Sequence, residues 1–166
     1  MSNQDLSIRE AGLEDIPQIV EMWVEFLKQH DKIVLGANKR LAPYVLRKKS
    51  AAKNYGEFLQ ERMGSGGVVF IAELGGKTAG YSLVFAKDEI PIFEIETYGY
   101  ISDLYVKEEF RGKGVSSSLK EAAVAWCKKK GLKHISIALY PDNKFAHDLY
   151  NKWGFFDYKT EVRKEI

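Results

Sequence analysis

The chain has 166 residues, 45% of them hydrophobic and 29% charged, and its formal net charge is +2. This is the composition of an ordinary globular domain, and it excludes a disordered chain, a collagen and a coiled coil. A nearly balanced charge argues against a general nucleic-acid binder, which needs a strong basic field. The length suits one domain with one core, which we place at residues 1–166.

No segment predicts export or membrane insertion. Apolar runs such as residues 67–72 are far shorter than a bilayer span, and the first ten residues lack a basic, apolar signal pattern. We therefore expect a cytoplasmic protein without membrane contacts. Cys127 is the only cysteine and lies in an apolar helical pattern, so we expect it to be packed. The histidines fall in different elements, so we predict no metal site.

Periodicity predicts the elements in chain order. Residues 6–9 alternate like a short strand, and residues 13–30 place apolar side chains at helical spacing after a proline in the opening turn. Gly36 and Pro43 interrupt residues 31–50, where we expect an irregular segment, and residues 55–63 resume a helical pattern.

The second half alternates strands and helices. The predicted elements are a hairpin over 68–87 turning at Gly75-Gly76, a strand over 93–106, a helix from 115 to Gly131, a strand over 134–139, a short helix within 142–154 and a last strand over 155–166. This order predicts an α/β (α+β) domain whose sheet combines antiparallel hairpins with one strand-helix-strand crossover.

A glycine-rich turn follows the 93–106 strand in the stretch VKEEFRGKGVSSSLKEA, residues 106–122. Glycines let a ligand approach the backbone, several N–H groups converge there, and the dipole of the next helix favours an anion. The turn therefore predicts a phosphate site. It lacks the GxxxxGK[ST] and GxGxxG spacings, which argues against the common nucleotide loops.

Two motifs carry a family resemblance. DLYVKEEFRGKGVSSSL resembles the acyl-CoA signature of the GNAT superfamily of N-acetyltransferases, with Arg111, Gly114 and Ser116 on its positions and serine replacing the usual final Gly or Ala. Downstream, NKFAHDLYNKWGFF matches the second family element at Asn143, Ala146, Leu149, Tyr150, Lys152, Gly154 and Phe155. Two motifs in order, on the expected elements, are far more specific than either alone.

The resemblance implies a GNAT fold with a mixed, mostly antiparallel sheet of six to seven strands and about four helices. It implies transfer of an acetyl group from acetyl-CoA to an amine of a small molecule or peptide by direct attack in a ternary complex, and a possible homodimer. The implied CoA contacts are the strand residues Leu104, Tyr105 and Val106, the turn residues Arg111, Gly112, Lys113, Gly114, Val115, Ser116 and Ser117, and the helix residues Asn143, Ala146 and Tyr150.

The resemblance also implies catalytic roles. Tyr150 matches the acid that protonates the leaving thiolate, although it can also simply pack its helix, and Asn143 can be a helix cap instead of a CoA contact. The base is Glu96, through water, or Asp103, which reaches the same face only if the strand bulges; each can equally have a plain surface or ion-pair role.

Two other functions remain open. Some relatives carry a glutamate where Ser102 stands, so a non-catalytic acyl-CoA-binding or regulatory module is the alternative, and a nucleotide-binding protein is a third possibility. We expect the acceptor site between the first helix, the 31–53 segment and the 93–100 strand. Its expected wall has four aromatic residues, Tyr44, Phe93, Tyr98 and Tyr100, and three acids, Asp31, Glu94 and Glu96.

Overall fold

The computed structural model describes residues 5–166, so the first four residues of the predicted 1–166 domain lie outside the described residues. The strands are β1 (Leu6–Glu10), β2 (Val68–Leu74), β3 (Lys77–Asp88), β4 (Thr97–Val106) and β5 (Ile135–Ile137). The α-helices are α1 (Ile16–Ala37), α2 (Ala51–Gly64), α3 (Val115–Lys129) and α4 (Lys144–Lys152). Three short 3-10 helices, η1 (Leu13–Asp15), η2 (Lys39–Tyr44) and η3 (Glu108–Phe110), join them.

The five strands form one sheet in the order β1-β2-β3-β4-β5. Neighbours are antiparallel from β1 to β4, whereas β5 runs parallel to β4 after the α3 crossover. The predicted mixed sheet with a single crossover is therefore confirmed. Short loops join β2 to β3 and β3 to β4. The parallel strands β4 and β5 require a long crossover, which α3 supplies.

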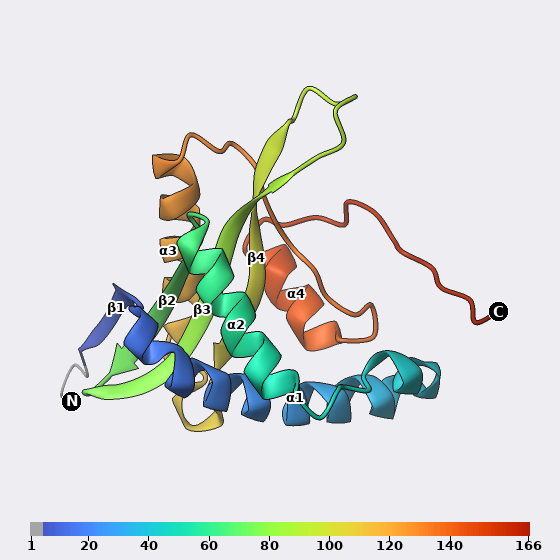
Figure 1. The fold of residues 1–166 in the computed structure, drawn as a ribbon, viewed down its shortest axis with the longest axis horizontal. Coiled ribbons are helices and arrows are strands. Elements are labelled where there is room, and N and C mark those ends of the chain that lie inside the picture. Colours follow the sequence, from blue (N-terminus) through green and yellow to red (C-terminus); the bar gives the residue numbers. More distant parts are fainter. Residues whose placement is uncertain (1–4) are drawn as a thin grey trace.

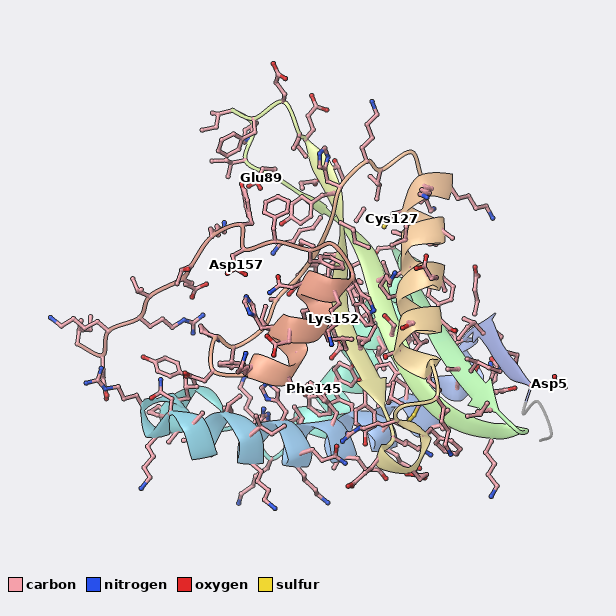
Figure 2. The ribbon with its side chains drawn as sticks, turned by 180° about the vertical axis from the view of Figure 1, so that it is seen from behind. Asp5, Glu89, Cys127, Phe145, Lys152 and Asp157 are labelled. Atoms are coloured by element: carbon pink, nitrogen blue, oxygen red, sulfur yellow. The ribbon has the colours of Figure 1, made fainter. Side chains whose placement is uncertain are left out.

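Helices cover both faces of the sheet (Figure 1). On one face, α1 and α2 bury a cluster that includes Ile19, Leu59, Tyr81 and Tyr105. On the other face, α3 packs the residues of its apolar stripe against β1 to β4. The single cysteine, Cys127, belongs to this second cluster and is buried there, as expected. Figure 2, seen from behind, shows α3 and α4 on this side, with Cys127 labelled.

The predicted number of strands was wrong, because residues 155–166 form no strand. Their apolar side chains alternate as a strand would require, but Phe156, Tyr158 and Val162 are strongly exposed. A strand needs a partner edge, and β5 offers only three residues. The segment therefore runs away from the sheet without pairing, as Figure 1 shows for the red end of the chain.

Two element boundaries also differ from the prediction. The first helix continues through Gly36 to Ala37, because an exposed glycine near a helix end costs too little to stop it. The third long strand begins at Thr97 and not at residue 93, since Pro91 and its neighbours form a loop between β3 and β4.

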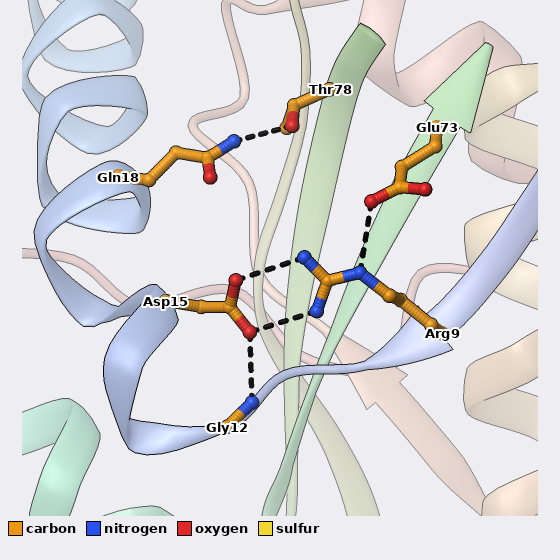
Figure 3. Close-up of polar contacts among 6 residues, drawn as sticks. All are labelled: Arg9, Gly12, Asp15, Gln18, Glu73 and Thr78. Atoms are coloured by element: carbon orange, nitrogen blue, oxygen red, sulfur yellow. Dashed lines mark hydrogen bonds and ion pairs between the residues drawn. The ribbon is translucent and has the colours of Figure 1, made fainter. Parts of the chain in front are cut away.

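An ion-pair network fixes the start of α1 against the sheet (Figure 3). Arg9 of β1 donates two hydrogen bonds of 2.8 Å to Asp15 and a third of 2.9 Å to Glu73 of β2. Hydrogen bonds from Arg9 hold the pKa of Asp15 below its usual value. Gln18 adds a contact to Thr78 of β3. These bonds orient α1, whose later turns face the site described below.

No helix within residues 5–166 is both long and apolar enough to cross a bilayer.

Candidate active site

The turn between β4 and α3 presents a row of free backbone donors. Gly112 and Gly114 adopt φ values of 72° and 82°, in the left-handed region that only glycine occupies without strain. Within residues 5–166 no backbone or side-chain acceptor takes the N–H groups of residues 112 to 117. Six donors beside the positive end of α3 form a cradle for an anionic group such as a phosphate.

Two cations stand at this turn. Arg111 donates to the carbonyl of Val106 at 3.1 Å and contacts the Gln29 side chain of α1. Lys113 donates to the carbonyl of Glu109 at 3.0 Å and lies over the ring of Phe110. Both cations are exposed, so their charge remains available to a ligand at the turn. The role of Gln29 had no signal in the sequence, because the contact joins positions 82 residues apart.

The strand β4 has an open edge next to this turn. It pairs with β5 only from Gly99 to Ile101, so residues 102–106 have no strand partner on that side among the described residues. The three residues expected to contact the pantetheine arm, Leu104, Tyr105 and Val106, lie in this unpaired stretch. The carbonyl of Val106 accepts from Arg111, but the other backbone groups on this edge that β3 does not take can pair with an extended amide-containing ligand as another strand would.

A β-bulge in β4 decides which side chains share a face. Leu83 pairs with Asp103 but Val84 pairs with Ile101, which leaves Ser102 as the extra residue. Side chains two positions apart normally share a face, so Tyr100 and Asp103 would point to opposite faces in a regular strand. The bulge brings both to the face covered by α1 and α2. The sequence analysis required a bulge in this strand for Asp103 to reach that face, and the structure has the bulge.

The carboxyl group of Asp103 lies in a poorly hydrated environment. It keeps some accessible surface, but the surrounding protein is dense enough that burial raises its pKa to about 6. Hydrogen bonding by Ser102 and Tyr55 partly offsets this effect. Tyr55 of α2 and Tyr81 of β3 lie beside it, with their hydroxyl oxygens 3.2 Å apart. Burial, followed by the charge of Asp103, raises the pKa of both phenols.

These two tyrosines were missed by the sequence reasoning. The available signal was a tyrosine at position 81 within the otherwise aliphatic strand AGYSLVF, where a buried hydroxyl requires a partner. Nothing in the sequence indicated that the partner would be Tyr55.

Glu96, the other candidate base, lies elsewhere. It is exposed and precedes the first residue of β4. Eight residues of extended chain separate it from Leu104, which corresponds to roughly 25 Å at the usual rise of a strand. The structure therefore does not bring Glu96 and Asp103 to one place.

The short helix α4 carries the remaining predicted residues. Asn143 caps it, with its side-chain oxygen accepting from the N–H of Ala146 at 3.3 Å. Tyr150 is partly buried between Trp153 and Phe155, with ring centroids 5.7 and 6.1 Å away. Burial raises the pKa of Tyr150 to about 12, so its phenol is protonated at every physiological pH.

The residues of the expected acceptor wall come from separate elements. Tyr98 and Tyr100 do share one face of β4, and Tyr100 packs edge-on against Phe85 at 5.5 Å. Phe93, however, is exposed on the β3–β4 loop. Asp31 is paired with Arg47, so it is not a free anion for a cationic ligand.

No group of three or more potential metal-binding side chains occurs in the part of the chain that the structure describes. The absence of a metal from the reaction stays a prediction.

The donor-rich turn and the open strand edge beside it suit a ligand with an anionic group and an extended amide-containing arm. The model of the Acetyltransferase (GNAT) family matches residues 38–155. The chain belongs to this family, as its two motifs indicated.

Relatives agree with this assignment. The chain is 26% identical over 149 residues to an uncharacterized N-acetyltransferase of Methanocaldococcus jannaschii, covering 90% of this chain but only 60% of that protein. It is 29% identical over 145 residues to an uncharacterized N-acetyltransferase of Archaeoglobus fulgidus, covering 87% and 89% of the two chains.

The fold has a solved counterpart in a predicted acetyltransferase of Clostridium acetobutylicum that was determined with acetyl-CoA. The TM-score is 0.72 at 18% identity, covering 97% of this chain and 96% of the other. At this identity the likeness shows the fold alone.

Proposed function

We propose that this protein is an N-acetyltransferase that transfers an acetyl group from acetyl-CoA to an amine of a small molecule or peptide. The observation that carries the proposal is the row of six free N–H groups at residues 112–117 next to the unpaired edge of β4. A ligand with a diphosphate at one end and an amide-containing arm at the other fits this pair of features. Acetyl-CoA has both, and it is present in the related structure described above.

The turn residues hold the diphosphate of acetyl-CoA. Their N–H groups donate to its oxygens, and Arg111 and Lys113 add positive charge. The amides of the pantetheine arm pair with the open edge from Leu104 to Val106, with Asn143 and Ala146 at the other wall. A backbone N–H of this strand then donates to the thioester oxygen as negative charge develops on it.

Asp103 is the base that accepts the proton of the attacking amine, directly or through one water. An amine with a pKa near ~10.4 is almost fully protonated at pH 7, so a base is required. A carboxyl with a pKa about 6 is ionised in roughly nine of ten molecules at pH 7 and is much more basic than an ordinary aspartate. Glu96 is too remote and too exposed to compete for this role.

Tyr150 donates to the departing sulfur. Its pKa of about 12 lies well above the value of about 8.5 that is typical of a thiol. Complete proton transfer from this phenol would therefore be uphill by roughly 5 kcal/mol, at 1.36 kcal/mol for each pKa unit. A hydrogen bond that stabilises the thiolate is the better description of its role.

Direct attack in a ternary complex is favoured over an acyl-enzyme. The one cysteine of the sequence, Cys127, is buried, and burial raises the pKa of its thiol, so it is a poor nucleophile. Initial rates at several concentrations of both substrates test this mechanism. We expect intersecting double-reciprocal lines, whereas parallel lines would require a covalent intermediate.

Titration calorimetry with CoA tests the binding half of the proposal. We expect binding that weakens when Arg111 and Lys113 are both replaced by alanine, and that is unchanged in the Lys128→Ala, Lys129→Ala control on the far end of α3. Binding of ATP in preference to CoA would overturn the assignment.

A further inference from the structure

A pocket of about 370 Å³ lies between α1, the segment that follows η2, and the start of α2. Its wall includes Trp23 of α1 and Tyr55 of α2, whose ring centroids are 4.3 Å apart where the two helices lie side by side (Figure 1). Leu46, which is 80% exposed, adds apolar area to the lining. This surface, which we call the α1–α2 pocket, suits the hydrocarbon part of a small ligand.

Tyr55 joins the α1–α2 pocket to Asp103. Its side chain lines the pocket, whereas its hydroxyl lies 3.2 Å from the hydroxyl of Tyr81 and hydrogen-bonds with Asp103. The bulge in β4 turns Asp103 toward the same face of the sheet. A single side chain therefore spans the distance between the pocket and the carboxyl group that acts as the base.

The polar side of the pocket is positively charged. Residues 39–53 contain six basic residues and no acid, and they supply both charged lining residues, Arg47 and Lys48. Arg47 is neutralised by Asp31, to which it donates a hydrogen bond of 2.9 Å. Lys48 and its neighbour Lys49 are exposed and make no ion pair within residues 5–166. Their charge is therefore available to a ligand.

The acids that the sequence placed beside an acceptor do not offset this charge. Asp31 is held by Arg47, while Glu94 and Glu96 are exposed before β4 and do not line the pocket. Asn54, the remaining polar lining residue, is uncharged. A ligand with a positively charged end would be repelled by Lys48, whereas a negatively charged end would pair with it.

We propose that the α1–α2 pocket holds the acceptor, and that the acceptor is an amine with a negatively charged group, such as a carboxylate, at the end remote from the amine. This inference rests on the proposed acetyl transfer and narrows its substrate class. The amine extends past Tyr55 toward Asp103, and the body of the molecule packs on Trp23 and Leu46. The anionic group faces Lys48 and Lys49, and the ion pair fixes the orientation of the acceptor.

Three amines that share one benzene ring test this charge selectivity. They are para-(aminomethyl)benzoate, para-methylbenzylamine and para-xylylenediamine, which differ only in the group opposite the reacting amine. We expect kcat/KM for the benzoate to exceed that for the methyl compound on the order of tenfold, because an ion pair is gained. The diamine should be the poorest acceptor, since its second ammonium group meets Lys48. A phosphonate in place of the carboxylate distinguishes phosphate-bearing from carboxylate-bearing acceptors.

Reversing the charge of the pocket should reverse this order. Lys48→Glu with Lys49→Glu should prefer the diamine over the benzoate, whereas a general defect in folding would lower all three rates alike. The matched control is Lys128→Glu with Lys129→Glu on α3, which changes the net charge by the same amount and should keep the order of the wild type. Thermal unfolding checks that each variant is folded.

Binding is measured separately from turnover, through the backbone amide NMR signals of the CoA-saturated protein as each probe is added. We expect the benzoate to shift the signals of residues 46–55. Equal kcat/KM for the three amines, an unchanged order in the Lys48→Glu, Lys49→Glu variant, or no shift at residues 46–55 would overturn this inference and leave acetyl transfer as such intact. Shifts at these residues without turnover of any probe would contradict the proposed transferase and leave the charge selectivity of the pocket standing.

Discussion

Replacing Asp103 by asparagine should change activity and stability in opposite directions. The carboxylate is costly to keep ionised in its poorly hydrated position, yet the reaction needs it as a base. Asparagine has nearly the same shape and can still accept hydrogen bonds from its neighbours, but it cannot take a proton from the amine. The substitution therefore separates the electrostatic role of the group from its packing.

The size of the stability effect follows from the pKa of Asp103. Its pKa is about 6 in the folded protein, against 3.8 for an unperturbed aspartate. The folded state thus binds the proton more tightly, and the free energy of unfolding falls as the pH rises from about 4 to above 6. The shift of roughly 2.2 units corresponds to at most about 3 kcal/mol, and the residual exposure of the group makes the actual cost smaller.

Asp103→Asn should therefore raise the free energy of unfolding at pH 8 by up to about 3 kcal/mol, with little change at pH 4. The same variant should lower kcat by roughly 10²- to 10⁴-fold, the usual contribution of a positioned base. For the wild type, kcat/KM should rise with pH through a break near 6, provided that the amine titrates well above that pH.

Urea unfolding at several pH values measures the first effect, and acetyl transfer to the best available amine measures the second. Glu96→Gln is the matched control, because it removes one exposed carboxylate from the same hairpin. We expect that control to leave both quantities nearly unchanged. An Asp103→Asn variant with normal kcat, or one that loses stability at pH 8, would show that the reasoning on this carboxylate is wrong.

Three further predictions concern the CoA side of the site. Tyr150→Phe should lower kcat roughly ten- to hundredfold by the same factor across pH 6 to 9, because a phenol with a pKa about 12 stays protonated there. Gly114→Ala should weaken CoA binding in calorimetry and cost about 1 to 2 kcal/mol of stability, since its φ is 82°; Gly36→Ala, in a helix, is the control. Asn143→Ala should cost about 1 kcal/mol by removing the cap of α4, while Asn143→Asp should retain it.

Each of these has a contradicting result. A Tyr150→Phe variant whose loss appears only above a particular pH would mean that the phenol titrates in that range. A Gly114→Ala variant that binds CoA normally would place the diphosphate away from the turn. Equal unfolding free energies for the alanine and aspartate variants of Asn143 would mean that its side-chain bond contributes nothing.

Much of the fold could be predicted from the sequence, because the patterns that indicate its elements are local. The glycine pair at 75–76 fixed the β2–β3 hairpin, and the apolar stripe of residues 13–30 fixed most of α1. The last strand was mispredicted because alternation in residues 155–166 describes one chain segment, whereas a strand requires an edge to pair with. The short β5 does not supply that edge.

The sequence predicted only part of the candidate site. Glycines and serines at residues 112–117 predicted a donor-rich turn, since their conformational needs are local. The position of Asp103 depended on a bulge at Ser102, which no residue type signals by itself. Its neighbours Tyr55 and Tyr81 come from a helix and another strand, and only the packed structure brings them to the carboxyl group.

The most direct test of the account is a thiol-release assay with acetyl-CoA and a panel of amines, with the acetylated product identified by mass spectrometry. We predict that free CoA thiol appears only when an amine is present and in equal amount to the acetylated amine. Tight binding of CoA without turnover of any amine would contradict this prediction, and the protein would then be an acyl-CoA-binding module on the same fold.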